Sequence, residues 1–240
     1  MKLPDFSFEE KLWKKGFEVV AGADEVGRGS LAGPLVAAAV VFPASFARCL
    51  LAKLKGIKIN DSKKLSAKQR EIAAVWIKEN CLAWGIGEVS VSFINKHGIV
   101  KATRKAFRKA LGETRNKLQD TKIDFLLVDA FYISYTKGIK RKNQLAVVKG
   151  DEKSFSIAAA SIIAKVYRDK LMSSLARRDL AARPGRVPPR ELKYYKQDLR
   201  KYAWEKNKGY GTKEHVEAIK KYGVTKLHRK MFVRKIVGAD

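Results

Sequence analysis

The sequence predicts an α/β protein, because segments with strand patterns alternate along the chain with segments that have helix patterns. The strand-like segments are short, and are either apolar or alternating: 18–24, 34–41, 81–89, 123–128 and 144–148. Three longer segments have helical spacing or helical length: 66–80, 92–118 and 155–175. A chain of 240 residues, of which 46% are hydrophobic, can bury a sizeable core.

The first two predicted strands are expected to pair as a hairpin. Gly33-Pro34 lies between segments 18–24 and 34–41 and fits a tight connection. The second segment is apolar throughout, which is typical of a strand buried on both faces. Residues 1–16, which precede the first strand, are interpreted as a charged lead-in with a single anchor, Trp13.

An acidic pair, Asp24-Glu25, ends the first strand, and Gly27-Arg28-Gly29 follows at once. Neighbouring side chains of a strand point to opposite faces, so both acids can serve one site only where the glycines let the backbone leave strand geometry. The amides of such a turn can bind an oxygen, which suggests a site for metal and phosphate. A solvated strand end is the more common explanation for an acidic pair taken alone.

A helix start is predicted at Ser66, because Ser66 and Gln69 have the spacing of a capping box. Lys63 and Lys64 lie just before it. Positive side chains near a helix start are unfavourable unless an anion binds there, so the two lysines could hold a phosphate. A solvated loop explains them equally well.

Segment 81–89 alternates as a half-buried strand does, and 92–118 has the apolar side of a packed helix. The other side of 92–118 is basic and carries Lys101, Arg104, Lys105, Arg108 and Lys109. Such a side is usually just a solvated helix face, although it could add to a positive field around the protein.

Carboxylates follow three of the predicted strands. Asp24 and Asp129 stand where apolar strands stop, and Asp151 comes shortly after segment 144–148. Ligand sites of α/β sheets lie outside the carboxyl ends of strands. The three acids together therefore indicate a site at this edge of the sheet.

The last third of the chain changes character after an apolar helix at 155–175, to which we assign no chemistry of its own. Residues 183–190 are rich in Pro and Arg and are expected to form a loop. Beyond the loop the chain is basic and aromatic, a combination that suits stacking over a phosphate track. Tyr210 lies between two glycines, which favours ligand contact, whereas packing in the core is expected for Tyr194, Tyr195 and Trp204.

The charge of the chain favours a polyanionic partner. Lys and Arg number 51 against 24 Asp and Glu, which gives a formal net charge of +27. A membrane surface is less favoured, because we find no basic amphipathic anchor helix, and the longest apolar run, 31–47, is broken by Gly and Pro. Cys49 and Cys81 have neither metal-ligand nor disulfide spacing and are expected to be reduced core thiols of a cytoplasmic protein.

The sequence resembles the type 2 ribonucleases H, ribonuclease HII of bacteria and archaea, over most of its length. The motifs that carry the resemblance are Gly22-Ala23-Asp24-Glu25-Val26-Gly27-Arg28-Gly29 with Gly33-Pro34, Asp61-Ser62-Lys63-Lys64-Leu65, Val128-Asp129, Lys149-Gly150-Asp151, 158–166 with Arg168-Asp169, 207–212 with His215, and His228-Arg229. Residues 183–190 depart from the family, where this connection is usually shorter and less basic. Residues 230–232 also depart from it, at a point where the family usually has Ser-Phe.

The resemblance implies a ribonuclease H-like fold, with a five-stranded mixed sheet flanked by helices and a small helical C-terminal subdomain. The implied domains are a catalytic domain at 1–182, the Pro/Arg-rich loop at 183–190 and a substrate-binding subdomain at 191–240. The implied activity is endonucleolytic cleavage of the RNA strand of RNA·DNA hybrids and of single ribonucleotides embedded in duplex DNA, in ribonucleotide removal and primer processing. A monomer is expected.

The family's four catalytic and metal-binding acids fall on Asp24, Glu25, Asp129 and Asp151. Four converging carboxylates repel one another unless cations neutralise them, and oxygen ligands suit Mg²⁺ or Mn²⁺. A pair of ions would give 5′-phosphate and 3′-hydroxyl ends, with the cut on the 5′ side of the ribonucleotide. The residues expected to bind substrate are Gly27, Arg28 and Gly29, which read the 2′-hydroxyl, Tyr210 at the RNA–DNA junction, and Ser62, Lys63 and Lys64.

Two other functions remain open on the sequence. Type 3 ribonuclease H shares much of the C-terminal pattern, but it normally has an extra N-terminal domain and lacks the arginine between the glycines. A basic nucleic-acid-binding protein without activity is the alternative outside the enzymes; its acids would merely end strands.

Overall fold

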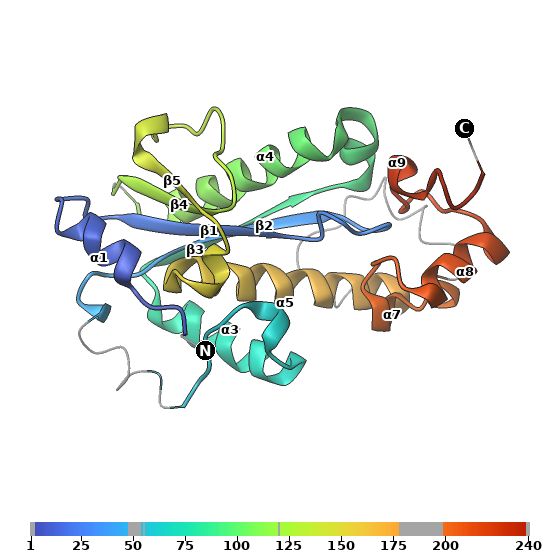
Figure 1. Cartoon of the computed structure of the whole chain (residues 1–240), viewed down its shortest axis with the longest axis horizontal. Coiled ribbons are helices and arrows are strands. Elements are labelled where there is room, and N and C mark those ends of the chain that lie inside the picture. Colours follow the sequence, from blue (N-terminus) through green and yellow to red (C-terminus); the bar gives the residue numbers. More distant parts are fainter. Residues whose placement is uncertain (1–2, 48–53, 55, 120, 178–198, 239–240) are drawn as a thin grey trace. The chain divides into compact units, whose positions relative to one another are not determined.

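A five-stranded mixed sheet is the main element of the computed structural model of the protein, which describes residues 3–47, 54, 56–119, 121–177 and 199–238 (Figure 1). In the order β3-β2-β1-β4-β5, β1 is antiparallel to β2 and parallel to β4, and β4 is parallel to β5. The strands are β1 (Val20–Val26), β2 (Leu35–Val41), β3 (Ala83–Val89), β4 (Phe125–Asp129) and β5 (Gln144–Val147). The predicted strands and the predicted hairpin are confirmed.

The chain divides into two compact units. The first comprises Met1–Val26, Val36–Glu88 and Thr103–Val166, and the second comprises Gly27–Leu35, Val89–Ala102 and Tyr167–Asp240. Several predictions lie outside the described residues: the domain boundary at 182, the loop 183–190, Cys49, Tyr194 and Tyr195.

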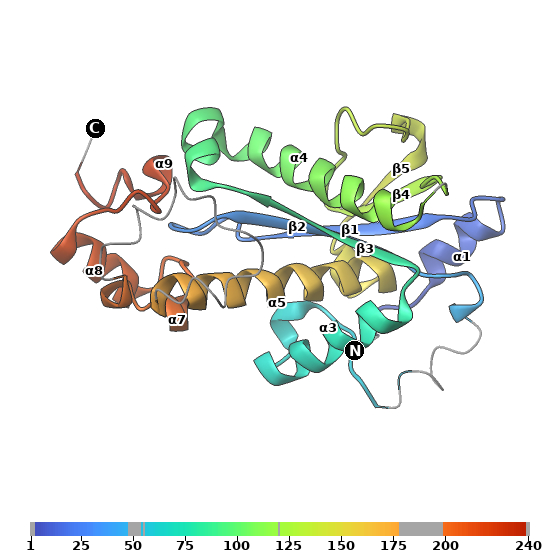
Figure 2. The ribbon, with the colours of Figure 1, turned by 180° about the vertical axis from the view of Figure 1, so that it is seen from behind.

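Helices lie on both faces of the sheet (Figures 1 and 2). Helices α3 (Ala67–Asn80) and α5 (Phe155–Arg177) lie on one face and α4 (Val91–Lys117) on the other. In the first unit, glycines of the strands allow helices α5 and α4 to approach the sheet closely. A Cβ atom on Gly22 of β1 would lie 2.3 Å from the carbonyl carbon of Ser156 in α5, and one on Gly87 of β3 would lie 1.9 Å from the carbonyl oxygen of Ala106 in α4.

The three predicted helices are present, with one difference. Ser66 caps α3 through a complete capping box, in which the amide of Gln69 donates to the Ser66 hydroxyl at 3.2 Å and the Ser66 amide donates to the Gln69 side chain at 2.8 Å. Helix α4 is interrupted at Gly98, whose φ of 78° and ψ of 164° are not helical. Short 3₁₀ helices are η1 (Ser62–Lys64), η2 (Arg141–Asn143) and η3 (Gly150–Glu152).

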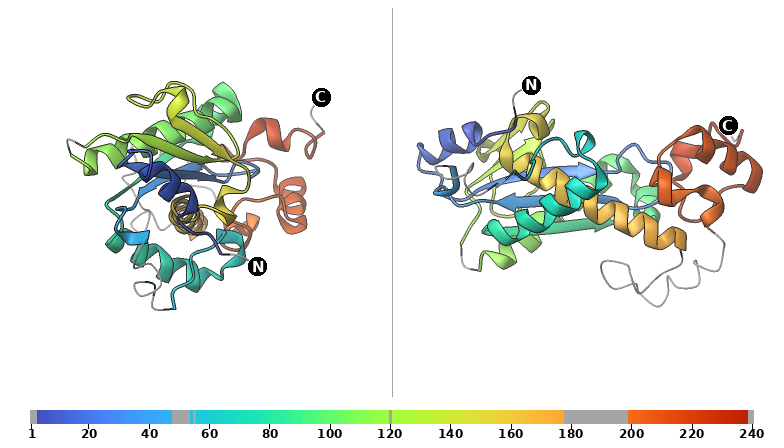
Figure 3. Two further views of the ribbon diagram at one scale, coloured as in Figure 1. Left: turned by 60° about the vertical axis from the view of Figure 1, so that its left-hand side comes forward. Right: turned by 90° about the horizontal axis from the view of Figure 1, so that it is seen from below.

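The interpretation of residues 1–16 as a charged lead-in is wrong, because Ser7–Trp13 form helix α1 and join the core of the first unit. Glu9 is buried, and its Oε1 atom accepts hydrogen bonds from the Ser154 hydroxyl at 2.7 Å and the Ser156 amide at 3.0 Å. These bonds attach α1 to the start of α5 (Figure 3). Nothing in the sequence indicated that Glu9 would be buried, because it is an acidic residue in a charged segment.

The C-terminal part of the second unit is helical, as predicted. Its elements are η5 (Arg200–Tyr202), α7 (Trp204–Asn207), α8 (Lys213–Tyr222) and α9 (Lys230–Val233). Trp204 is fully buried in the core of this unit, which confirms its predicted place. Within the described part of the chain, no helix has both the length and the apolar character needed to cross a membrane.

Candidate active site

Parallel strands bring the predicted strand-end acids to one edge of the sheet in the first unit. Ala23 of β1 pairs with Val128 of β4, so Asp24 and Asp129 are the next residues on two neighbouring strands. Asp151 follows β5, the neighbour of β4, in the turn η3. The amide of Gly150 donates to Asp129 Oδ1 at 2.7 Å and fixes this turn against β4.

Two acids of this group are buried, Asp24 at 6% exposed and Asp151 at 4% exposed. Burial and the neighbouring charge of Glu25 raise the pKa of Asp24 well above its ordinary value; the Ser161 hydroxyl opposes the rise, and Asp129 and Asp151 add to it. The pKa of Asp151 is also raised, by burial first, although Lys63 acts against the rise. The carboxylates therefore share one electrostatic field, and bringing them together is unfavourable without a cation.

Lys63 provides a positive charge at this group. Its Nζ atom lies 3.1 Å from Asp151 Oδ2 and 3.4 Å from Asp61 Oδ1. Burial acts to lower the pKa of Lys63, but the hydrogen bond and charge of Asp151, together with Asp61, outweigh it and raise the pKa. Lys63 is thus firmly cationic, and its side chain is nevertheless 75% exposed.

The other two residues of this predicted substrate-binding segment also contact first-unit side chains. Lys64 Nζ lies 3.2 Å from Glu152 Oε2. Ser62 is buried, and its hydroxyl is 3.0 Å from the hydroxyl of Ser161. The capped turn at Asp61 sets both positions, because the Asp61 side chain accepts a hydrogen bond from the Lys63 amide at 3.0 Å.

The expected departure from strand geometry at the acidic pair is wrong. Strand β1 continues through Asp24 and Glu25 to Val26, and both acids pair with β2. The left-handed turn begins at Gly27, whose φ is 89°. Glu25, which is half-buried, therefore lies on the opposite face of β1 from Asp24, although its charge still acts on Asp24.

The ligands available at this edge of the sheet are carboxylate oxygens, which suit Mg²⁺ or Mn²⁺ rather than zinc. The mutual repulsion of buried carboxylates is the condition that a divalent cation relieves. Among the described residues, no three His, Cys, Asp or Glu side chains are already grouped to hold an ion. The acids therefore fit a metal by chemistry and by charge, while Asp151 is paired with Lys63.

The predicted reader of the 2′-hydroxyl, Gly27-Arg28-Gly29, belongs to the second unit and begins there at Gly27, which is buried. A Cβ atom on Gly27 would lie 2.1 Å from Nε of Arg168, so a glycine is required both by its φ and by this neighbour. Arg28 and Gly29 are exposed.

Two buried arginines that sequence reasoning left without a role hold this turn and the segment after it. Arg168 donates to the carbonyls of Pro34 at 3.0 Å, Ala32 at 3.1 Å and Lys208 at 2.8 Å. Arg229 donates to the carbonyl of Arg28 at 2.9 Å and twice to that of Gly33. The signal was present in the sequence, because both arginines belong to the motifs, but nothing in the pattern indicated their burial.

Tyr210 lies beside the same segment in the second unit. The Gly209 carbonyl accepts hydrogen bonds from the amides of Leu31 at 2.9 Å and Ala32 at 3.1 Å. The guanidinium carbon of Arg168 lies 5.3 Å from the centre of the Tyr210 ring. Within this unit, the structure therefore brings Tyr210 together with the segment that follows Gly27-Arg28-Gly29.

Ser30, directly after the glycine turn, gives a first prediction. Its side chain is fully buried, and its hydroxyl has no hydrogen-bond partner within the described structure. Ser30→Ala is expected to raise the free energy of unfolding by about 1 kcal/mol, since an unpaired buried hydroxyl is costly. Urea unfolding measures this. Ser154→Ala is the matched control and should destabilise the protein, because that buried hydroxyl donates to Glu9. A loss of stability with Ser30→Ala would contradict the assignment.

Comparison with known proteins identifies the family. The family model described as Ribonuclease HII matches residues 21–187. Ribonuclease HII of Caldanaerobacter subterraneus subsp. tengcongensis is 44% identical over 230 residues, which cover 96% of this chain and 80% of the relative. The enzyme of Bacillus subtilis is 42% identical over 226 residues, or 94% of this chain and 74% of the relative.

Solved structures agree in fold. Ribonuclease H2 from Pyrococcus horikoshii superposes with a TM-score of 0.60 at 25% identity, covering 91% of this chain and 96% of that one. Bst-RNase HIII in complex with Mn²⁺ superposes with a TM-score of 0.59 at 19% identity, covering 90% of this chain and 65% of that one. This second likeness concerns the fold alone. The chain, with its strand-end acids and its glycine-arginine-glycine turn, belongs to the ribonuclease HII family of metal-dependent endoribonucleases.

Proposed function

We propose that this protein cleaves the RNA strand of RNA·DNA hybrids and single ribonucleotides in duplex DNA by means of the carboxylates Asp24, Glu25, Asp129 and Asp151. The observation that carries the proposal is the convergence of Asp24 on β1, Asp129 at the end of β4 and Asp151 after β5, where the pKa of buried Asp24 is raised by burial and by the other acids. Burial of mutually repelling carboxylates lowers stability, so a group of this kind is more readily explained by chemistry than by folding.

Asp24, Asp129 and Asp151 would hold Mg²⁺ or Mn²⁺, and a pair of ions is the arrangement we favour. Glu25, the fourth acid, lies on the other face of β1 and would contribute through its charge, which acts on Asp24. The Mn²⁺ complex of Bst-RNase HIII supports a divalent ion on this fold. When bound, such ions supply an activated water and neutralise charge on the leaving 3′-oxygen, which gives 5′-phosphate and 3′-hydroxyl ends. The cut is placed on the 5′ side of the ribonucleotide.

The chain's own residues hold the substrate. Gly27, Arg28 and Gly29 would read the 2′-hydroxyl, because Arg28 and Gly29 are exposed and Arg229 holds the carbonyl of Arg28. The 2′-hydroxyl is the group that distinguishes RNA from DNA at a given nucleotide. Tyr210, which is half-buried, would contact the sugar at the RNA–DNA junction.

Ser62, Lys63 and Lys64 would bind a phosphate beside the acids. The Lys63 side chain is largely exposed while it contacts Asp151, so it can reach a phosphate without a change in the fold. Lys63 would leave Asp151 when a cation binds there, and its charge would then be available to the nucleic acid.

The cellular role that fits this activity is removal of ribonucleotides from DNA and processing of RNA primers in the cytoplasm. We further propose that the protein acts as a monomer, with the catalytic domain at 1–182, the loop at 183–190 and the substrate-binding subdomain at 191–240.

The test is cleavage of a duplex that contains one embedded ribonucleotide, with Mg²⁺ or Mn²⁺ and with EDTA. We expect a single cut on the 5′ side of the ribonucleotide with either metal, and no cut with EDTA. Equal cleavage in EDTA would overturn the proposal. Cleavage of long hybrids without cleavage at the lone ribonucleotide would instead indicate the specificity of type 3.

Binding is expected to weaken steeply with salt, because the net charge of +27 neutralises phosphates and releases their counterions. The measurement is the affinity of the Asp24→Asn protein for the same duplex between about 50 and 200 mM NaCl, over which six or more phosphate contacts would cost roughly 10³-fold. An affinity that does not change with salt would exclude a basic binding track.

A further inference from the structure

Two buried histidines that belong to the sequence motifs have no part in the function proposed above. His215 lies in the first turn of α8, and His228 lies just before α9. Both are at most 1% exposed. Their rings lie among those of Tyr202 and Trp204, with the His228 ring centre 4.9 Å from that of Tyr202. All four residues belong to the second unit, as does Tyr210.

The hydrogen bonds of His215 define its tautomer. The indole Nε1 of Trp204 can only donate, and it lies 3.0 Å from Nε2 of His215. Nε2 of His215 must therefore be an acceptor without a proton. The proton is then on Nδ1, which lies 2.8 Å from the backbone carbonyl of Tyr210 and donates to it.

The hydrogen bonds of His228 define the complementary tautomer. The backbone amide of Thr225 donates to Nδ1 of His228 at 2.8 Å, so this nitrogen has no proton. The proton is therefore on Nε2, which lies 3.3 Å from the acceptor Nε2 of His215. Nε2 of His215 has one lone pair, which the Trp204 donor at 3.0 Å and the His228 donor at 3.3 Å share, and both histidines are neutral.

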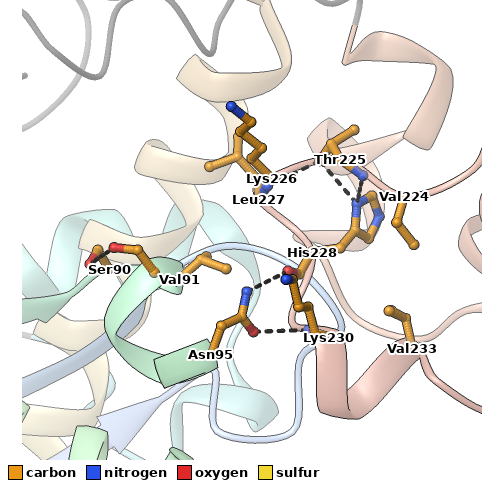
Figure 4. A pocket seen from close by; sticks show the side chains of 11 residues that line it. Ser90, Val91, Asn95, Val224, Thr225, Lys226, Leu227, His228, Lys230 and Val233 are labelled. Atoms are coloured by element: carbon orange, nitrogen blue, oxygen red, sulfur yellow. Dashed lines mark hydrogen bonds between the residues drawn. The ribbon is translucent and has the colours of Figure 1, made fainter. Parts of the chain in front are cut away.

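The far end of this chain of bonds is anchored to the backbone. The side-chain amide of Asn95 donates to the carbonyl of His228 at 3.2 Å and accepts from the amide of Lys230 at 2.9 Å (Figure 4). Asn95, Thr225 and His228 line one side of a cavity of about 460 Å³. His228 is therefore held by its backbone on one side and by Thr225 on the other.

At the other end of this chain of bonds, His215 contacts a loop at residues 208–210, which is neither helix nor strand. Lys208 and Gly209 have positive φ values of 50° and 80°. The amide of Tyr210 donates to the Asn207 carbonyl at 2.9 Å, and its carbonyl accepts from the Thr212 amide at 2.9 Å as well as from His215. The bond from His215 thus adds a side-chain donor to the Tyr210 carbonyl, and it restricts the direction in which the Tyr210 side chain leaves the backbone.

We propose that His215 and His228 are positioning residues for Tyr210. The two neutral histidines form a hydrogen-bonded relay that fixes the Tyr210 backbone, so that Tyr210 can contact the sugar at the RNA–DNA junction. The inference rests on the proposed role of Tyr210. Its chemical content is the direction of the bonds: Trp204 and His228 both donate toward Nε2 of His215, and this keeps the proton of His215 on Nδ1, which donates to the Tyr210 carbonyl.

A matched pair of substitutions separates positioning from general packing. In His215→Asn the side-chain amide can take the place of Nδ1 and still donate to Tyr210, but it cannot reach Trp204. In His215→Gln the amide reaches the place of Nε2 and keeps the Trp204 bond, but it loses the bond to Tyr210. Both variants remove the ring, so their packing costs should be similar.

The readout is the ratio of kcat/KM for a junction substrate to kcat/KM for a long hybrid. We expect His215→Gln to lower this ratio about tenfold, the effect of one hydrogen bond, and His215→Asn to change it less than about twofold. In a Tyr210→Ala background, His215→Gln should lower the ratio no further, because both changes act through Tyr210. An equal fall in both variants, or no fall in either, would overturn the proposal.

Nitrogen-15 NMR of the wild-type imidazoles gives a readout that does not depend on activity. The chain has three histidines, so the signals can be assigned by single substitutions. At pH 7 we expect neutral His215 protonated on Nδ1 and neutral His228 protonated on Nε2. The opposite tautomers, or a charged ring, would overturn the relay even if the variants failed to fold. If Tyr210→Ala itself left the substrate ratio unchanged, the role of Tyr210 would be wrong, and the relay would have no sensor to position.

Discussion

Asp24→Asn is expected to reduce kcat at an embedded ribonucleotide on the order of 10³-fold or more, while the duplex is bound as tightly as before or more tightly. The substitution keeps the shape of the side chain and removes one charge from the site proposed to hold divalent ions, whose stabilisation of the transition state is worth several kcal/mol. Removal of a negative charge also reduces repulsion of the phosphates. Single-turnover cleavage and fluorescence anisotropy measure the two effects separately.

Asp129→Asn is expected to behave in the same way, because Asp129 is the neighbour of Asp24 on β4. Glu205→Gln is the matched control, since Glu205 forms a surface ion pair with Arg177 at 2.8 Å in the second unit. It should leave cleavage unchanged. If Asp24→Asn and Glu205→Gln had equally small effects, the acids would be strand ends on a binding protein and the catalytic assignment would fail.

Gly22→Ala is expected to destabilise the protein by about 3 kcal/mol or more and to abolish activity in the fraction that folds. The added Cβ would lie 2.3 Å from the Ser156 carbonyl carbon and 2.5 Å from the Ile157 amide nitrogen, and neither backbone atom can give way without moving α5. Overpacking of this kind costs 1–3 kcal/mol or more even when flexible side chains absorb it. Gly22 lies two residues before Asp24, so a shift of β1 would also displace the acid.

Gly112→Ala provides the control for this substitution. Gly112 lies inside α4, and a Cβ atom there would meet nothing within 4 Å. This variant should be stabilised by about 0.5–1 kcal/mol, because alanine favours a helix interior over glycine. The free energies of unfolding of the two variants and the wild type, measured by chemical unfolding, make the comparison. If Gly22→Ala were as stable as the wild type, α5 would not approach β1 as closely as the structure shows.

Short sequence patterns correctly predicted the strands, the start of a helix and the grouping of the acids. The apolar runs became buried strands, the Ser66 capping box began α3 where expected, and the acids of β1 and β4 lie at one edge of the sheet with the acid that follows β5. These features depend on alternation, capping and parallel pairing, each of which leaves its own mark in a short stretch of sequence.

Features that depend on distant partners were not predicted. Glu9 is buried because Ser154 and Ser156 donate hydrogen bonds to it. Arg168 is buried because backbone carbonyls from other segments accept hydrogen bonds from its guanidinium group. A charged side chain gives no sign in the sequence of the partners that will surround it. The expectation for Glu25 failed for a related reason: pairing with β2 keeps the strand regular through both acids, and the glycine turn begins only at Gly27.

The central claim is that a divalent cation relieves the repulsion among Asp24, Asp129 and Asp151. In EDTA, Asp24→Asn should unfold at a higher temperature than the wild type, because burial and neighbouring acids raise the pKa of Asp24 and make its charge unfavourable in the folded state at neutral pH. Binding of Mn²⁺ to the folded state should then stabilise the wild type by about 2.7 kcal/mol at 100 times its Kd, and the variant far less.

The most direct measurement is therefore thermal unfolding of both proteins in EDTA and in saturating Mn²⁺. We expect the order of stability to reverse, with Asp24→Asn more stable in EDTA and the wild type more stable in Mn²⁺. Equal stabilisation of the two proteins by Mn²⁺, or no stabilisation of the wild type, would contradict it.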